Sequence, residues 1–202
     1  MAERGEQVLH LEAIASHKGS ILGQHPINKQ PSQKRFETSL WNVLRKTKPT
    51  KTIFVEKEGG KIGKLTLPKE LTRAILKSPS ILIDVNLDTR VNHLLRDYEY
   101  FIENPTALTP LLDLFIKHND QNKIEKWKIL LRDRAFFDLV KSLLVDHYDP
   151  TYKATSTKDS TIAQKVVRFK WPSNLELEKH VIFQSNVINE MKDLIADQDR
   201  VL

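Results

Sequence analysis

A His-Lys-Gly-Ser sequence at residues 17–20 carries residue types suited to binding an anion. His17, Lys18 and Ser20 can donate hydrogen bonds to phosphate oxygens, and the glycine between them lets backbone amides approach closely. The segment follows a short apolar stretch and lies in a long polar region, and long loops inside compact domains are often functional. A solvated loop without a ligand explains the same residue types, and on those types alone we prefer that explanation.

Acidic residues follow a second apolar segment. Glu56 comes directly after residues 52–55, at the position where the strands of an α/β sheet usually present their ligands. A carboxylate there can hold Mg²⁺ through water, as acids at strand ends do in phosphate-transferring enzymes. An acid that simply faces solvent explains Glu56 equally well, and Glu58 is a weaker candidate.

Three further cations, Lys61, Arg90 and Arg96, could clamp a phosphate, since the planar guanidinium of arginine suits that task. A solvated helix face explains them better without further information. The histidines show no paired spacing typical of a metal site, so we predict no metal. The sequence contains neither G-x-x-x-x-G-K-[ST] nor G-x-G-x-x-G, and we assign no catalytic residue.

Composition limits the classes of protein to which the chain can belong. With 202 residues, of which 40% are hydrophobic, it can bury the core of one domain, with or without an appendage. It has no cysteine, which excludes disulfides, thiolate metal sites and persulfide chemistry on this chain. We expect a cytoplasmic protein with no membrane segment, because no apolar run approaches the length of a membrane-spanning helix.

The net charge of +6 is compatible with a nucleic-acid or phosphate partner, although many basic proteins are merely soluble. The basic residues cluster between residues 29 and 51, which raises our expectation of RNA binding. The members of this cluster are Lys29, Lys34, Arg35, Arg45, Lys46, Lys48 and Lys51.

Apolar spacing predicts alternating strands and helices over the first 104 residues, which is typical of an α/β layer with a mostly parallel sheet. A loop is expected over 15–31, and Ser32 is expected to cap the helix that follows it. We expect the other elements as follows: strands over 7–11 and 52–55, a turn at 58–61, a helix from Pro68 to Lys77, a buried strand over 80–85, and a helix from Asp88.

Beyond Asn104-Pro105 the pattern changes to three helical stretches over 106–118, 122–131 and 134–145. A turn at 148–150 should close this block, and a polar linker over 153–161 follows. A strand over 162–171 and a charged helix over 175–197 complete the expectation. We therefore predict three regions: 1–104, 105–152, and 153–202 as linker and extension.

Several short segments, taken together, resemble bacterial tRNA 2-selenouridine synthases. Residues 11–20 (LEAIASHKGS) are similar to a LEGLANHRGS stretch of that family, and 30–33 with Phe36-Glu37 match its QPSQ and FE pattern. Residues 55–63 (VEKEGGKIG) look like VEDESRRIG, Arg90-Val91 and Asp97-Tyr98 look like its RV and DY pairs, and 148–152 match YDPxY. Order and spacing agree from about residue 8 to 152.

The resemblance implies an incomplete P-loop NTPase-like parallel sheet with a C-terminal helical block. It adds Gln30 and Gln33 to the candidate phosphate or tRNA contacts, beside His17, Lys18, Ser20 and the cations above. In this family, selenium replaces the sulfur of wobble 2-thiouridine in tRNA by way of S-geranyl-2-thiouridine. Selenophosphate and geranyl diphosphate are used as co-substrates, so the resemblance implies no cofactor on this chain.

This chain departs from the family pattern at several points. It has no rhodanese-like domain with its cysteine and no Walker A strand and loop before residue 7. Lys57 replaces an acid, Gly60-Lys61 stands where two arginines are usual, and residues from about 160 match nothing in the pattern. We expect a missing strand in the middle of the sheet to leave the strands near residues 8 and 53 with exposed edges.

Three functional hypotheses follow from these observations. The chain is the C-terminal portion of a selenouridine synthase, inactive alone; or a non-catalytic tRNA-binding module; or a partner subunit that docks through residues 175–197 on a second chain. Binding of tRNA with steep salt dependence would favour the second.

Overall fold

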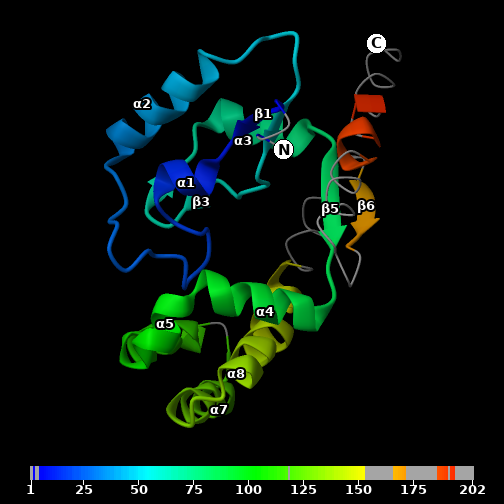
Figure 1. The fold of residues 1–202 in the computed structure, drawn as a ribbon. Coiled ribbons are helices and arrows are strands. Elements are labelled where there is room, and N and C mark those ends of the chain that lie inside the picture. The colour runs from blue at the N-terminus through cyan, green and yellow to red at the C-terminus, as the bar shows by residue number, and fades with distance from the viewer. Residues whose placement is uncertain are drawn as a thin grey trace. The chain divides into compact units, whose positions relative to one another are not determined.

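The structure of the chain is a computed structural model (Figure 1). It describes residues 2, 5–117, 119–152, 166–171, 186–190 and 192–193. The fold is mixed α/β and divides into two compact units. The first unit comprises Met1–Ile83 and Gln164–Leu202, and the second comprises Asp84–Ala163. The three regions expected from the sequence stay a prediction, and the first of them extends across the division after Ile83.

Two parallel strands begin the first unit. Strand β1 (Gln7–Leu9) pairs with β2 (Ile53–Val55), with Val8 opposite Phe54. Both strands were predicted. They are hydrogen-bonded directly to each other, and among the described residues their sheet has no third strand, so each keeps one edge without a strand partner.

Two helices separate these strands along the chain. The short helix α1 (Leu11–Ala15) was not predicted, whereas α2 (Gln33–Leu44) was. The Ser32 hydroxyl accepts a hydrogen bond from the Arg35 amide at 3.3 Å, so the predicted cap is confirmed. The remaining residues between α1 and α2 form the expected long loop.

A hairpin that the sequence did not reveal follows β2. Strands β3 (Lys61–Ile62) and β4 (Leu65–Thr66) pair antiparallel, and α3 (Lys69–Lys77) begins after Pro68. One hydrophobic core holds these elements together. Its largest fully buried members come from β1, α1, α2 and β3: Leu9, Leu11, Phe36 and Ile62.

Strand β5 (Ser80–Asp84) pairs with β6 (Val166–Lys170), and both strands lie where the sequence predicted them. The predicted burial of β5 was wrong, because Leu82 and Ile83 are 43% and 41% exposed. An apolar run indicates a buried strand only where layers cover both faces of the sheet. Among the described residues this sheet has two strands.

The second unit is helical, as predicted for most of its length. It contains α4 (Leu87–Asp97), α5 (Glu99–Glu103), η2 (Pro105–Ala107), α6 (Thr109–Asp113), η3 (Leu114–Lys117), α7 (Gln121–Arg132) and α8 (Phe136–Leu143). Its core includes Trp127, whose indole N–H donates to the Ser142 hydroxyl at 3.0 Å, and Phe115, whose ring meets Trp127 edge-on.

The predicted turn at 148–150 was wrong, because the chain remains helical through Tyr152. A π-helical turn, η4 (Leu144–Tyr148), directly precedes this last helical segment. Proline inside a regular α-helix clashes with the carbonyl four residues earlier, and a wider π turn changes the position of that carbonyl. Pro150 is thus accommodated without ending the helix.

The predicted helix over 175–197 lies largely outside the described residues. Within it, 186–190 are helical, and Ile188 packs against Phe54 of β2. The Lys192 ammonium donates to the Glu6 carboxylate at 2.8 Å. Among the described residues, no helix is both long and apolar enough to cross a membrane.

Candidate functional site

The carboxyl ends of β1 and β2 bring the first candidate residues together. Because the strands are parallel, the residues that follow them lie at the same edge of the sheet. The Glu56 carboxylate accepts a hydrogen bond from the Leu11 amide at 2.5 Å and from the Glu12 amide at 3.4 Å. Glu56 therefore satisfies free amides at the start of α1, which sequence reasoning did not foresee. Nδ1 of His10 lies 3.5 Å from Oε1, the other carboxylate oxygen of Glu56.

Three carboxyl groups gather at this edge: Glu12, Glu56 and Glu58. A side-chain hydrogen bond joins Glu12 to Glu58. Burial, together with the charges of Glu58 and Glu56, raises the pKa of Glu12 to about 7, while Lys18 acts in the opposite direction. Burial also raises the pKa of Glu58. Two carboxyls can share a hydrogen bond only when one is protonated, so the pair can hold a proton close to neutral pH.

The loop that contains residues 17–20 is closed on itself. The Lys18 amide donates to the Gly23 carbonyl at 2.8 Å, and His17 forms an antiparallel bridge with Gln24. His17 is buried, its Nδ1 accepts from the Gly19 amide at 3.2 Å, and burial lowers the pKa of its ring. At neutral pH the ring is therefore uncharged, and a charged contact with phosphate falls to other groups.

Gly19 brings this loop against the carboxyl cluster. It adopts a φ of +67°, and a Cβ built on it would lie 2.8 Å from Glu58 Oε2. Only glycine combines this backbone conformation with so close an approach. The loop and the carboxyl pair of Glu12 and Glu58 thus form one cluster, from which Lys18 acts on Glu12 electrostatically.

The two glutamines suggested by the family resemblance hold the β3–β4 hairpin. Gln30 donates to the Ile62 carbonyl and accepts from the Lys64 amide, both at 2.9 Å. Gln33 donates to the Thr66 carbonyl at 2.7 Å and accepts from the Thr66 amide at 3.0 Å. Each side-chain amide is thus engaged with backbone, and its contact with phosphate or tRNA stays a prediction.

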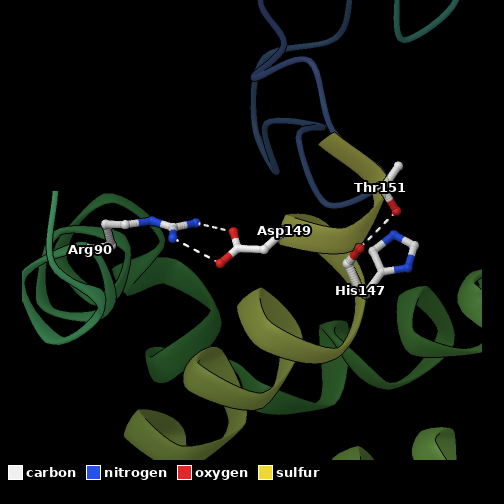
Figure 2. Close-up of polar contacts among 4 residues, drawn as sticks. All are labelled: Arg90, His147, Asp149 and Thr151. Carbon is white, nitrogen blue, oxygen red and sulfur yellow. Dashed lines mark hydrogen bonds and ion pairs between the residues drawn. The ribbon is translucent and has the colours of Figure 1, made fainter. Parts of the chain in front are cut away.

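The remaining candidates lie elsewhere. Ser20 is half-buried in the loop, and Lys61 is exposed on β3. Arg90 and Arg96 are on α4 in the second unit, whereas the other seven candidates belong to the first unit. The Arg90 guanidinium makes two hydrogen bonds to the Asp149 carboxylate, at 3.0 and 2.6 Å, as Figure 2 shows. Arg96 is exposed.

Glu12 was missed as a candidate by sequence reasoning. The available signal was its position three residues after the first strand, near the same edge of the sheet at which Glu56 directly follows the second strand. The hydrogen bond between Glu12 and Glu58 joins positions 46 residues apart, and nothing local in the sequence indicates it.

Comparisons with known proteins place this chain. A family model described as the tRNA 2-selenouridine synthase AAA domain matches residues 1–109. A tRNA 2-selenouridine synthase of Alcanivorax borkumensis is 32% identical over 179 residues, covering 74% of this chain and 49% of the relative. The corresponding protein of Shewanella frigidimarina is 39% identical over 98 residues, covering 48% of this chain and 26% of the relative. No solved structure matches.

This chain spans from about a quarter to about half the length of these curated relatives. The family model covers more than half of the 202 residues, and its range includes all nine candidate site residues. The resemblance noted in the sequence is confirmed: this chain belongs to the tRNA 2-selenouridine synthase family.

Proposed function

We propose that the chain takes part in replacing sulfur by selenium in the wobble 2-thiouridine of tRNA, by way of S-geranyl-2-thiouridine. The observation that carries the proposal is the match of residues 1–109 to the AAA domain of tRNA 2-selenouridine synthases. The two relatives compared above bear the same name. The partner of the chain in this reaction is tRNA.

The arrangement of the first unit supports this proposal. Parallel strands with a loop and carboxylates at their carboxyl ends fit a P-loop NTPase-like sheet, in which ligands bind at that edge. Selenophosphate and geranyl diphosphate are the proposed co-substrates, and both carry phosphate. Lys18 and Lys61 are the candidate cations of this unit, and Ser20 is a candidate donor.

We further propose that these 202 residues do not complete the reaction alone and that a cysteine and a phosphate-binding loop outside them are needed. The sequence contains no cysteine and no G-x-x-x-x-G-K-[ST] loop, and the family uses both. The carboxyl pair of Glu12 and Glu58 is then one part of a larger site.

Mass spectrometry of tRNA nucleosides tests this proposal directly. The purified chain is incubated with thiolated tRNA, selenophosphate and geranyl diphosphate, with and without a polypeptide carrying the rhodanese-like and P-loop segments of a relative. We expect 2-selenouridine only when both polypeptides are present. Absence of selenium from both mixtures, while a complete relative is active in parallel, would overturn the proposal.

A non-catalytic tRNA-binding module is the second candidate function. It is favoured by the seven basic residues between 29 and 51, all of which are exposed. A tRNA-binding measurement across a salt series, made beside the nucleoside analysis, separates the two functions. A binding module binds tRNA in a salt-dependent manner and transfers no selenium in either mixture.

A further inference from the structure

The positive charge of this chain is concentrated in one segment. Residues 29–51 contain seven basic residues and one acid, Glu37, whereas the whole chain contains 32 and 26. The rest of the chain therefore contains 25 basic and 25 acidic residues, and the entire net charge of +6 lies in this segment. Within the described residues, none of these seven side chains forms an ion pair with a carboxylate.

Helix α2 displays part of this charge along one face. Phe36 and Leu40 are buried on its inner side. Lys34, Thr38 and Trp41 of the helix are followed at the same three- and four-residue spacing by Arg45, the helical C-cap residue, and all four are exposed. Residues at such spacing line one face of a helix. At 1.5 Å per residue this face extends about 16 Å, which is long enough to meet several nucleotides.

Trp41 lies within this basic surface and is 61% exposed, which is unusual for so large an apolar side chain. The Arg45 guanidinium carbon lies 5.0 Å from the centre of its ring, and Arg45 Nε donates to the Asn42 side chain at 3.1 Å. The indole is thus oriented beside a cation on the outside of the helix. An exposed indole beside cations suits the stacking of nucleic-acid bases.

The turn after α2 adds two cations in a fixed backbone. The Gln7 side chain donates to the carbonyls of Lys48 and Lys51 at 3.2 and 3.0 Å and accepts from the Lys48 amide. Strand β1 thereby holds the turn through one side chain. Lys48 and Lys51 are exposed, so a preformed turn presents their ammonium groups beyond the end of the helix.

We propose that Lys34, Thr38, Trp41, Arg45, Lys48 and Lys51, here called the α2 stripe, bind single-stranded RNA. Trp41 stacks on an unpaired base, and the basic side chains contact the phosphates on either side. The choice of RNA among polyanions rests on the proposed function, in which the modified base lies in an unpaired loop of tRNA. An indole among cations favours bases joined by phosphates over an acidic peptide, which offers no base to stack.

Fluorescence anisotropy of the full 202-residue chain with a labelled single-stranded 12-nucleotide RNA tests this proposal. We expect Trp41→Ala to weaken binding roughly tenfold to a hundredfold, since one stacked base contributes that much, and Trp41→Phe to restore part of the loss. Lys34→Ala and Arg45→Ala should each lower the slope of log affinity against log salt by about 0.7. Helical circular dichroism of each variant checks that it is folded.

Charge-matched controls come from α3, where Lys69 and Lys77 are also exposed. Lys69→Ala and Lys77→Ala should leave affinity within about twofold of the unaltered chain if binding is local to the stripe. Equal losses from the α3 and α2 variants, or unchanged binding by Trp41→Ala, would overturn the proposal. The proposal would also be overturned if the chain bound a 12-base-pair duplex as tightly as the single-stranded RNA. Equal affinity for polyglutamate, lost to the same extent in Trp41→Ala, would overturn it as well.

This measurement uses unmodified RNA and no selenium donor, so it does not depend on catalysis. If the nucleoside analysis shows no selenium transfer while the chain binds the single-stranded RNA through Trp41, the proposed function is overturned and the role of the α2 stripe stands. Selenium transfer that is unaffected by Trp41→Ala, with unchanged affinity, would overturn the stripe and leave the proposed function in place.

Discussion

Glu12 and Glu58 share a hydrogen bond at the edge of the β1–β2 sheet, close to Glu56 and Lys18. In the unfolded chain each carboxyl is hydrated and far from the other. The folded chain brings them together and partly removes water, which disfavours the second negative charge. A pair of this kind can exchange a proton near neutral pH.

Substitution of Glu12 should change how stability depends on pH. Its pKa is about 7 in the folded chain and about 4.5 as the ordinary value, so the folded state binds more protons between these pH values. The contribution of Glu12 to the free energy of unfolding should fall as pH rises from about 4.5 to about 7, by about 1 to 2 kcal/mol after allowance for solvent screening. Glu12→Gln should remove this fall, as measured by urea unfolding at several pH values.

Glu70→Gln on α3 is the matched control, because Glu70 is exposed and lies outside the carboxyl cluster. It should retain the pH dependence of the unaltered chain. A Glu12→Gln variant whose stability depends on pH in the same way as that of the unaltered chain would show that other groups cause the dependence.

Gly63 is the second single residue on which the site depends. It has a φ of +58°, and a Cβ there would lie 2.4 Å from Gln30 Oε1 and 2.8 Å from His17 Nε2. Gly63→Ala should therefore lower the free energy of unfolding by about 1 to 3 kcal/mol, through backbone strain and displacement of Gln30. Gly59→Ala is the control, since nothing lies within 4 Å of its added Cβ, and equal thermal stabilities of the two variants would contradict this view.

At the scale of elements, the segment Gln30–Gln33 connects α2 to the β3–β4 hairpin. The hairpin has two short strands and, by itself, would be marginally stable in water. Side-chain amides that complete backbone hydrogen bonds act here like an added strand partner. The family-like QPSQ pattern thus has a structural role, independent of any contact with tRNA.

Gln33→Ala should lower the free energy of unfolding by about 1 to 3 kcal/mol, because the Thr66 amide and carbonyl lose their side-chain partner. Gln121→Ala is a matched control, since Gln121 is exposed and its amide donates to Glu125 on the same helix. Denaturant unfolding of the two variants gives the comparison. A Gln33 variant as stable as the Gln121 variant would contradict a stabilising role for the hydrogen bonds between Gln33 and Thr66.

At the scale of the whole molecule, each compact unit has its own internal links. In the second unit, the ion pair of Arg90 and Asp149 joins α4 to the last helical segment, 59 residues later in the chain. The carboxylate raises the pKa of Arg90, and both side chains are about one-third exposed. Two parallel hydrogen bonds make this pair stronger than a typical surface ion pair.

Arg90→Ala should lower the free energy of unfolding of the second unit by about 1 to 2 kcal/mol. The exchange of both residues, Arg90→Asp with Asp149→Arg, should recover part of the loss. Lys141→Ala is the control, since Lys141 and Asp88 form a single, more exposed ion pair in the same unit. Limited proteolysis reports on the unit itself, and equal cleavage of the Arg90 and Lys141 variants would contradict a structural role for the Arg90 pair.

Much of the secondary structure was predictable because it depends on local spacing. Helix α2 follows from Ser32 as a cap and from apolar residues at three- and four-residue intervals, and β1 and β2 follow from short apolar runs. The β3–β4 hairpin was missed because its two-residue strands are too short to show alternation, and side chains from elsewhere support it. The helical path through Pro150 was missed because a π turn leaves no clear local pattern.

Family membership, the loop of residues 17–20 and the basic segment 29–51 could all be inferred from residue types and their order along the chain. The roles of Glu56 and the two glutamines, and the carboxyl pair of Glu12 and Glu58, depend on tertiary structure alone. These contacts join residues that are 32 to 46 positions apart. Helix and strand patterns reflect near neighbours, whereas the environment of a carboxyl or amide depends on which distant backbone the folded core brings to it.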